Sequence, residues 1–152
     1  MSHPDFAIRP FTPADQVAAR DLVLDGLGEH FGWIDPSRNP DVDDIAAHYL
    51  ARGHLFVVAH IGETLVGTGA LIAVDEQTGR LVRMSVHRRW RRRGLGRALV
   101  AHLIAAARER GYRRVVVETN KDWWDAIVLY RQCGFHEYDV DEGSVYLELD
   151  LP

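Results

Sequence analysis

The sequence predicts a single α/β domain, in which helices alternate with the strands of one mixed sheet. Three observations lead to this fold class. A length of 152 residues with 47% apolar and 26% charged residues is typical of one globular domain. Apolar residues recur at helical spacing in some segments and form short uninterrupted runs in others. The two kinds of segment alternate in the order βααβββαβαββ.

A short strand and a helix are expected at the start of the chain. Residues 6–9, Phe-Ala-Ile-Arg, form a short apolar run that ends in a polar side chain, which indicates a strand. Thr12 offers a hydroxyl cap, and Pro13 and Asp15 are typical of the first helical turn. This helix is expected to end near Leu27, between two glycines.

A loop, a second helix and three strands are expected next. The loop covers residues 26–40, which contain five Gly or Pro and no periodic pattern. The second helix is expected over residues 41–51. Apolar runs at residues 55–60 and 64–74 flank a Gly-Glu turn and predict a hairpin, and a third strand is expected over residues 80–86.

Helical spacing returns after the third strand of this group. The expected inward-facing residues of that helix are Leu95, Ala98, Leu99, His102, Leu103 and Ala106. Gly111 ends the helix, and the apolar residues 115–117 show no alternation, which is typical of a strand covered on both faces. The last elements are a short helix closed by Gly134 and two strands, at residues 124–133, 135–138 and 144–149.

Cysteine content and hydropathy exclude several classes of protein. Cys133 is the only cysteine, so the chain has no internal disulfide and no cysteine pair for zinc. The eight histidines lack ligand spacing, and we expect no metal site. No apolar run approaches the ~20 residues of a membrane helix, and the N-terminus does not resemble a signal peptide. We therefore expect a cytoplasmic protein with no membrane partner.

Charge is distributed unevenly along the chain. Residues 77–108 contain nine arginines and no acid, although the whole chain has a net charge of −4. A basic segment in an acidic protein indicates a local anion site more than a surface that coats nucleic acid. We expect no nucleic-acid partner, and a salt-dependent affinity for DNA or RNA would contradict this expectation.

Residues 82–99 lead from an expected strand through an Arg- and Gly-rich loop into an amphipathic helix. Glycines at a helix start let backbone N–H groups approach an anion, and the helix dipole favours the anion by ~0.3–1 kcal/mol. Arginines around the loop add charge-assisted hydrogen bonds to phosphate oxygens. The segment therefore predicts a diphosphate site.

Three phosphate-binding motifs are candidates for this loop. A Walker loop needs Gly-Lys-Ser/Thr, which is absent. A dinucleotide-binding fingerprint fits poorly, because Leu99 occupies its third glycine position and seven residues separate Val86 from Gly94. The pattern Arg/Gln-x-x-Gly-x-Gly/Ala is matched by Arg91, Gly94 and Gly96.

With this loop the chain resembles the GNAT superfamily of N-acetyltransferases. Residues 126–135, which contain Leu129-Tyr130 and Gly134-Phe135, are similar to that family's Ala-x-x-Leu-Tyr-x-x-x-Gly-Phe segment. The resemblance is sharpest over residues 82–135. It implies one N-acetyltransferase domain over residues 1–152, with a mostly antiparallel sheet that is splayed at the cofactor site and has helices on both faces.

The resemblance implies acetyl-CoA as cosubstrate. Its pyrophosphate would be held by the loop and the helix start, at Arg91, Arg92, Arg93, Gly94, Leu95, Gly96 and Arg97. A Cβ at either glycine would fill the space of the diphosphate. Main-chain groups of Met84 and Val86 would pair with the pantetheine arm. Asn120 would be a further ligand, although its spacing to Ala126 departs from the family pattern and a helix-capping role is the alternative.

The resemblance also implies that an acceptor amine attacks directly in a ternary complex, with no Cys or Ser nucleophile. Tyr130 would protonate the leaving thiolate, because a phenol near pKa 10 and a thiol near 8.5 are well matched. The strand that often carries a catalytic glutamate has none here. Glu118 is the candidate base, acting through water, or else an acid paired with an arginine. A non-catalytic CoA-binding regulatory module is the alternative function.

The acceptor is the part that the sequence determines least. The resemblance places it near residues 24–50, and residues 29–44 have a net charge of −4. This charge predicts an acidic surface that attracts a cationic small-molecule amine, unless the acids serve only a helix start. His30, Phe31 and Trp33 would enclose the apolar part of the acceptor. The sequence leaves open whether acyl groups other than acetyl are transferred, whether the acceptor is a protein, and whether the chain forms a homodimer.

Overall fold

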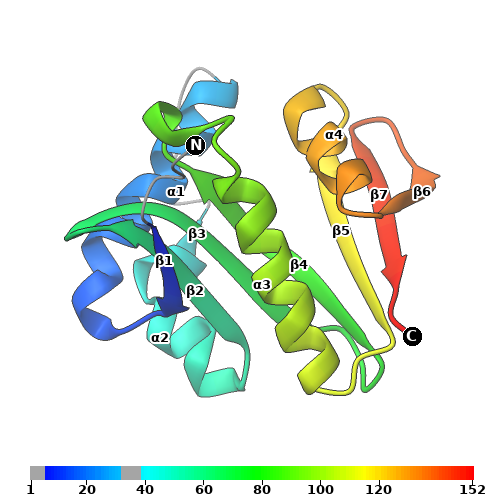
Figure 1. Cartoon of the computed structure of the whole chain (residues 1–152), viewed down its shortest axis with the longest axis horizontal. Helices are drawn as coiled ribbons and strands as arrows, with labels where there is room; N and C mark the ends of the chain where they lie inside the picture. Colours follow the sequence, from blue (N-terminus) through cyan, green and yellow to red (C-terminus); the bar gives the residue numbers. More distant parts are fainter. Residues whose placement is uncertain (1–5, 32–38) are drawn as a thin grey trace.

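In the computed structural model, which describes residues 6–31 (His30 and Phe31 as backbone only) and 39–152, the strands form one seven-stranded sheet (Figure 1). The strands are β1 (Ala7–Pro10), β2 (Leu55–Ile61), β3 (Thr64–Ala73), β4 (Thr78–Val86), β5 (Arg114–Asn120), β6 (His136–Val140) and β7 (Ser144–Asp150). Their order across the sheet is β1-β2-β3-β4-β5-β7-β6. All neighbours are antiparallel except β4 and β5, so the predicted mixed, mostly antiparallel sheet is confirmed.

Helices lie on both faces of the sheet, as the resemblance implied. On one face, α3 (Leu95–Glu109) and α4 (Trp124–Gln132) pack against buried side chains such as Val57 and Leu81. On the other face, α1 (Gln16–Phe31) and the short α2 (Ile45–His48) enclose a second apolar cluster around Phe56. None of the helices in the described ranges has the length and hydropathy needed to cross a membrane.

The strands β4 and β5 are joined at one end only. Their parallel pairing runs from Thr78 opposite Arg114 to Leu81 opposite Val117. Beyond this point β4 pairs with β3 alone and β5 with β7 alone, so the two halves of the sheet diverge (Figure 1). The predicted splay between these two strands is confirmed.

The first two helices differ from their expected bounds. The helix α1 continues past Leu27 and through both neighbouring glycines to Phe31. It packs along β3 and β4, and such packing outweighs the modest cost of glycine in a helix. The expected helix over residues 41–51 is broken into the 3₁₀ turn Pro40–Asp43, the helix α2 and the 3₁₀ turn Leu50–Arg52. The break occurs at Asp44, whose φ of −148° leaves the helical region.

The helix α3 confirms the predicted helical pattern with a shifted buried face. Leu95, Leu99 and Leu103 are buried as expected, whereas His102 is exposed. The other buried residues of α3 are Val100, Ile104 and Ala107. The helix contacts both β3 and β4, so its apolar stripe is turned toward the pair of strands.

A partly buried ion pair fixes the turn that leads into α1. Arg9 on β1 donates two hydrogen bonds to the carboxylate of Asp15, at 2.7 and 2.9 Å. The backbone N–H of Thr12 donates a third, at 2.9 Å. The hydrogen bonds from Arg9 outweigh the burial of the carboxylate and lower the pKa of Asp15 to about 2.

Asp15→Asn is expected to lower the free energy of unfolding at pH 7 by about 1–2 kcal/mol, since a lowered pKa measures how strongly the fold favours the carboxylate. This stability is fully present above the ordinary pKa near 4 and is lost as pH falls through the folded pKa near 2. Urea unfolding of both proteins between pH 7 and pH 2.5 would measure it. Asp21→Asn is the control, because Asp21 lies 3.9 Å from Arg20 on an exposed surface. A difference between wild type and Asp15→Asn that does not shrink with pH would contradict the prediction.

Candidate functional site

The Arg- and Gly-rich segment forms the turn that leads from the diverging end of β4 into α3. It begins with the 3₁₀ turn Arg88–Trp90. Arg92 and Gly94 follow in the left-handed region, with φ of +60° and +84°. Glycine adopts this conformation without steric cost, whereas a non-glycine residue there is strained. Such strain is concentrated at functional sites, and here it lies directly before the helix start.

The first turn of α3 presents unpaired backbone N–H groups. The first hydrogen bond within the helix runs from the N–H of Ala98 to the carbonyl of Gly94, at 3.0 Å. The N–H groups of Leu95, Gly96 and Arg97 have no acceptor among the residues that the structure describes. Gly94 is the N-cap and has no side chain that could accept from them. Together with the helix dipole, these donors fit an anion such as a diphosphate.

The two glycines of the motif are required for two different reasons. A Cβ at Gly94 would meet no atom within 4 Å, so the positive φ is the constraint. A Cβ at Gly96 would lie 3.2 Å from Cδ2 of Leu129, so this glycine allows α3 to approach α4. Arg97 strengthens the same contact by donating to Gln132 at 2.7 Å. The expectation that a Cβ at Gly96 would also fill the space of the diphosphate stays a prediction.

The arginines of the loop have distinct contacts. Arg91 lies 2.7 Å from the carboxylate of Glu29 on α1, and its Nε donates to the carbonyl of Val86 at 3.1 Å. Arg93 stacks over the ring of Trp90, 5.1 Å from its centroid. Arg91 therefore ties the loop to β4 and to α1, a role that its position in the motif did not reveal.

The diverging part of β4 contains a β-bulge. The single residue Gly69 of β3 lies opposite two residues of β4, Arg83 and Met84. Regular pairing resumes on either side of them. Arg83 has a φ of +55°, and its carbonyl accepts a hydrogen bond of 2.8 Å from the buried hydroxyl of Thr68. A bulge changes the direction of the backbone groups that follow it, and bulges are common beside active sites.

The backbone of Val86 faces away from β3. His87 donates its N–H to the carbonyl of Val66 at 2.8 Å, which makes these two residues a hydrogen-bonded pair. Because such pairs alternate along an antiparallel ladder, the next pair, Gly67 and Val86, is not hydrogen-bonded. The N–H of Val86 therefore points toward the gap between β4 and β5, while its carbonyl accepts from Arg91.

Tyr130 lies on α4 with only 4% of its surface exposed. Its ring packs edge-on against Phe135, with centroids 5.6 Å apart. Its hydroxyl makes no hydrogen bond to any residue in the described ranges. Burial raises the pKa of Tyr130 above its ordinary value of 10, so the phenol is protonated at neutral pH. This is the form that the predicted proton-donor role requires.

Glu118 is the first residue of β5 after its pairing with β4 ends at Val117. Its exposed carboxylate accepts a hydrogen bond of 2.9 Å from the hydroxyl of Ser144. It forms no ion pair within residues 6–31 and 39–152, so none of the arginines described there is its partner. Glu118 therefore lies at the point of divergence with its carboxylate accessible.

Asn120 ends β5 and closes the turn that leads toward α4. Its side-chain oxygen accepts from the N–H of Asp122 at 2.8 Å, and its carbonyl accepts from the N–H of Trp123 at 3.1 Å. The N-cap of α4 is Trp123. Asn120 thus caps the turn and not the helix itself, and its role as a cofactor ligand stays a prediction.

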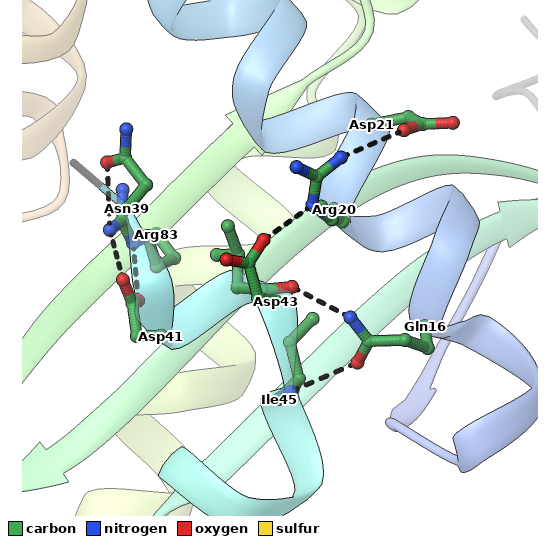
Figure 2. A network of polar contacts seen from close by, with 9 residues as sticks. Gln16, Arg20, Asp21, Asn39, Asp41, Asp43, Ile45 and Arg83 are labelled. Carbon is green, nitrogen blue, oxygen red and sulfur yellow. Dashed lines mark hydrogen bonds and ion pairs between the residues drawn. The ribbon is translucent and has the colours of Figure 1, made fainter. Parts of the chain in front are cut away.

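The acids near the predicted acceptor side are largely paired, as Figure 2 shows for two of them. Asp41 binds Arg83 at 2.6 Å, and Asp43 binds Arg20 at 2.8 Å. Glu29 binds Arg91 as described above. These arginines lie outside residues 29–44 and offset the negative charge that the sequence places there. The charge of this segment alone is therefore a poor guide to the acceptor.

Part of the predicted acceptor site lies outside the described residues. Trp33 and Asp35 belong to this part, as do the side chains of His30 and Phe31. In the described part of the chain, no three His, Cys, Asp or Glu side chains are grouped in a way that could hold a metal ion.

The sequence did not reveal the polar network around Arg83. Its guanidinium binds Asp41, which is 42 positions away in the chain, and Tyr49 donates to the same carboxylate at 2.5 Å. Nothing in the local pattern of either segment signals this pairing. It exists because the 3₁₀ turn Pro40–Asp43 lies beside the bulge of β4 (Figure 2).

Comparison with known proteins supports the resemblance. The model of the acetyltransferase (GNAT) family matches residues 21–135. Human N-acetyltransferase 8B is 35% identical over 109 residues, which are 68% of this chain and 48% of that protein. The chain thus spans about half the length of this relative.

Two solved structures resemble the whole fold. A GNAT-family acetyltransferase from Staphylococcus aureus superposes with a TM-score of 0.86 at 22% identity, over 97% of this chain and 99% of that chain. The PaiA N-acetyltransferase from Thermoplasma acidophilum, in complex with coenzyme A, superposes with a TM-score of 0.85 at 15% identity. That alignment covers 99% of this chain and 100% of the other.

Proposed function

Since the chain belongs to the acetyltransferase (GNAT) family, we propose that it transfers an acetyl group from acetyl-CoA to a primary amine. The observation that carries this proposal is the row of open amides at Leu95, Gly96 and Arg97, beside the gap between β4 and β5. The amides suit the diphosphate of CoA, and the gap provides unpaired strand backbone for an extended arm.

The reaction is a direct acyl transfer. Acetyl-CoA supplies an activated acetyl group as a thioester, which becomes an amide as the amine nitrogen bonds to the carbonyl carbon and CoA leaves as a thiol. Backbone N–H groups at the bulge of β4 would polarise the carbonyl, in the manner of an oxyanion hole. Tyr130 would donate its proton to the sulfur. The amine must lose a proton, and Glu118 would accept it through a water molecule.

A cationic small-molecule amine is our proposal for the acceptor. Support for it comes from carboxylates on and near β5 and β7, and not from residues 29–44. A hydrogen bond to Asp141, together with the charges of Glu118 and Asp139, raises the pKa of Tyr146 on β7 to about 12. Of these carboxylates, Glu118 lies where β4 and β5 diverge, and its negative charge favours an approaching cation there, whereas Asp139 and Asp141 lie at the β6 edge of the sheet.

A panel of amines tests the proposed function. Thiol release from acetyl-CoA should rise above the amine-free rate with at least one polyamine or basic amino-acid derivative. The ratio kcat/KM should fall as salt is added, because the attraction is screened. Turnover with only neutral or anionic amines would overturn the acceptor class. Calorimetric CoA binding without turnover of any amine would favour a regulatory CoA-binding module.

Glu118→Gln is expected to lower kcat by about 100-fold near neutral pH, the lower end of the 10²–10⁴-fold that a general acid or base contributes. The loss should become smaller at high pH, where the amine is already deprotonated. Ser144→Ala is the matched control, since it removes only the hydroxyl that donates to Glu118. A pH–rate profile of Glu118→Gln that coincides with wild type would assign the proton to another acceptor.

A further inference from the structure

Arg83 links the bulge of β4 to the segment on the opposite side of the sheet from α3. Its Nε and Nη2 donate to the two carboxylate oxygens of Asp41, at 2.9 and 2.6 Å, and Nη2 also donates to Asn39 at 3.2 Å. Figure 2 shows this fork between the strand and the 3₁₀ turn Pro40–Asp43. The geometry is bidentate, the arrangement that fixes a guanidinium most firmly.

Asp41 is itself held in place from the core. Tyr49 donates its hydroxyl to Asp41 at 2.5 Å, is 6% exposed, and packs edge-on against the fully buried Phe56 with centroids 5.1 Å apart. Arg83 is therefore connected, through Asp41 and Tyr49, to the buried apolar cluster around Phe56.

The backbone of Arg83 is the strained part of this arrangement. Its φ of +55° lies in the left-handed region, which any residue with a Cβ adopts only at a cost in free energy. Such a residue persists only where its surroundings over-determine it. Here the side chain is held by Asp41 and the carbonyl by Thr68, so both ends of the strained residue are fixed.

We propose that the Arg83–Asp41 pair is a positioning device that holds the bulge of β4 in the conformation required for acetyl transfer. The inference rests on the proposed function, in which backbone N–H groups at the bulge polarise the acetyl carbonyl. Arg83 is a positioning residue in this scheme, because its guanidinium acts through the backbone and not on the substrate.

Comparing Arg83→Ala with Arg83→Gly shows whether Arg83 acts through the conformation of its backbone or through its side chain directly. Arg83→Ala keeps the Cβ but loses the contact with Asp41. We expect kcat to fall about tenfold, because nothing then offsets the free-energy cost of the left-handed backbone at position 83. Arg83→Gly also loses this contact, but glycine adopts a positive φ freely. It is expected to recover kcat to within about threefold of wild type. CoA affinity by calorimetry should stay within about twofold in both, because the amides of α3 are untouched.

The second half of the experiment uses the partner and a control. Asp41→Asn should lower kcat in the wild-type background and have no further effect in the Arg83→Gly background. Arg20→Ala removes the neighbouring pair with Asp43, which joins α1 to the same 3₁₀ turn and has no hydrogen bond or ion pair to β4 in the described ranges. It should leave kcat unchanged. Thermal unfolding by circular dichroism shows that each variant is assayed while folded.

NMR chemical shifts of residues 82–85 provide a readout that does not depend on turnover. They should report the left-handed conformation at position 83 in wild type and Arg83→Gly, and its loss in Arg83→Ala. The inference is overturned if Arg83→Gly is as impaired as Arg83→Ala, or if Arg83→Ala behaves like Arg20→Ala. A wild-type protein that acetylates no amine would instead refute the proposed function, while the NMR result still decides whether the pair holds the bulge.

Discussion

Gly94→Asp is expected to weaken CoA binding by roughly 30-fold or more while the protein stays folded. The new carboxylate would lie at the start of α3, next to the open amides, where the diphosphate is proposed to bind. Two like charges about 5 Å apart repel by about 3 kcal/mol at an effective dielectric constant of 20. Even with screening, about 2 kcal/mol would remain, which corresponds to roughly 30-fold in Kd.

Gly94→Asn is the matched control for this charge. Asn and Asp have the same shape, and both tolerate the left-handed conformation that Gly94 adopts, with a φ of +84°. A Cβ at this position meets no atom within 4 Å, so neither side chain should disturb the packing. Calorimetric titration with CoA should show only a small loss of affinity for Asn. Equal affinity of wild type and both variants would place the cofactor elsewhere.

Tyr130→Phe is expected to lower kcat about 100-fold and to leave CoA affinity nearly unchanged. The substitution keeps the buried ring and its edge-on contact with Phe135 and removes only the proton donor. Loss of a general acid typically costs 10²–10⁴-fold in rate. Burial raises the pKa of Tyr130, so in wild type the donor should not be lost by deprotonation up to pH 10.

Initial rates of thiol release at saturating amine would measure the effect of Tyr130→Phe. Phe135→Leu is a useful comparison, because it alters the packing around Tyr130 and keeps the hydroxyl. A kcat near that of wild type in Tyr130→Phe would mean that the thiolate leaves unassisted or takes its proton from another donor. Tyr130 would then be a core residue of α4.

Most of the elements could be predicted because their signals are local. The hairpin of β2 and β3, the helix α3 and the strand β5 follow from apolar spacing and from glycines at their ends. The second helix could not be predicted in this way. Its acids are typical of a helix start, but Asp41 and Asp43 bind Arg83 and Arg20, and residues 40–43 form a 3₁₀ turn.

The candidate site also has features that local sequence predicts and features that depend on tertiary packing. The open amides at the start of α3 could be predicted from Gly94, because a glycine at a helix start leaves the first donors uncapped whatever packs around it. The function of Gly96 could not, since its contact with Leu129 depends on where α4 lies.

The sequence by itself determined the succession of most strands and helices, the turn with open amides at the start of α3 and the family to which the chain belongs. Each of these depends on short segments of the chain, within which the spacing of residue types specifies the geometry. Only the tertiary structure decided that Arg83 is held by Asp41 and that Glu118 accepts from Ser144. These pairs join segments far apart in the chain, and their distances are set by the packing of the whole sheet and its helices.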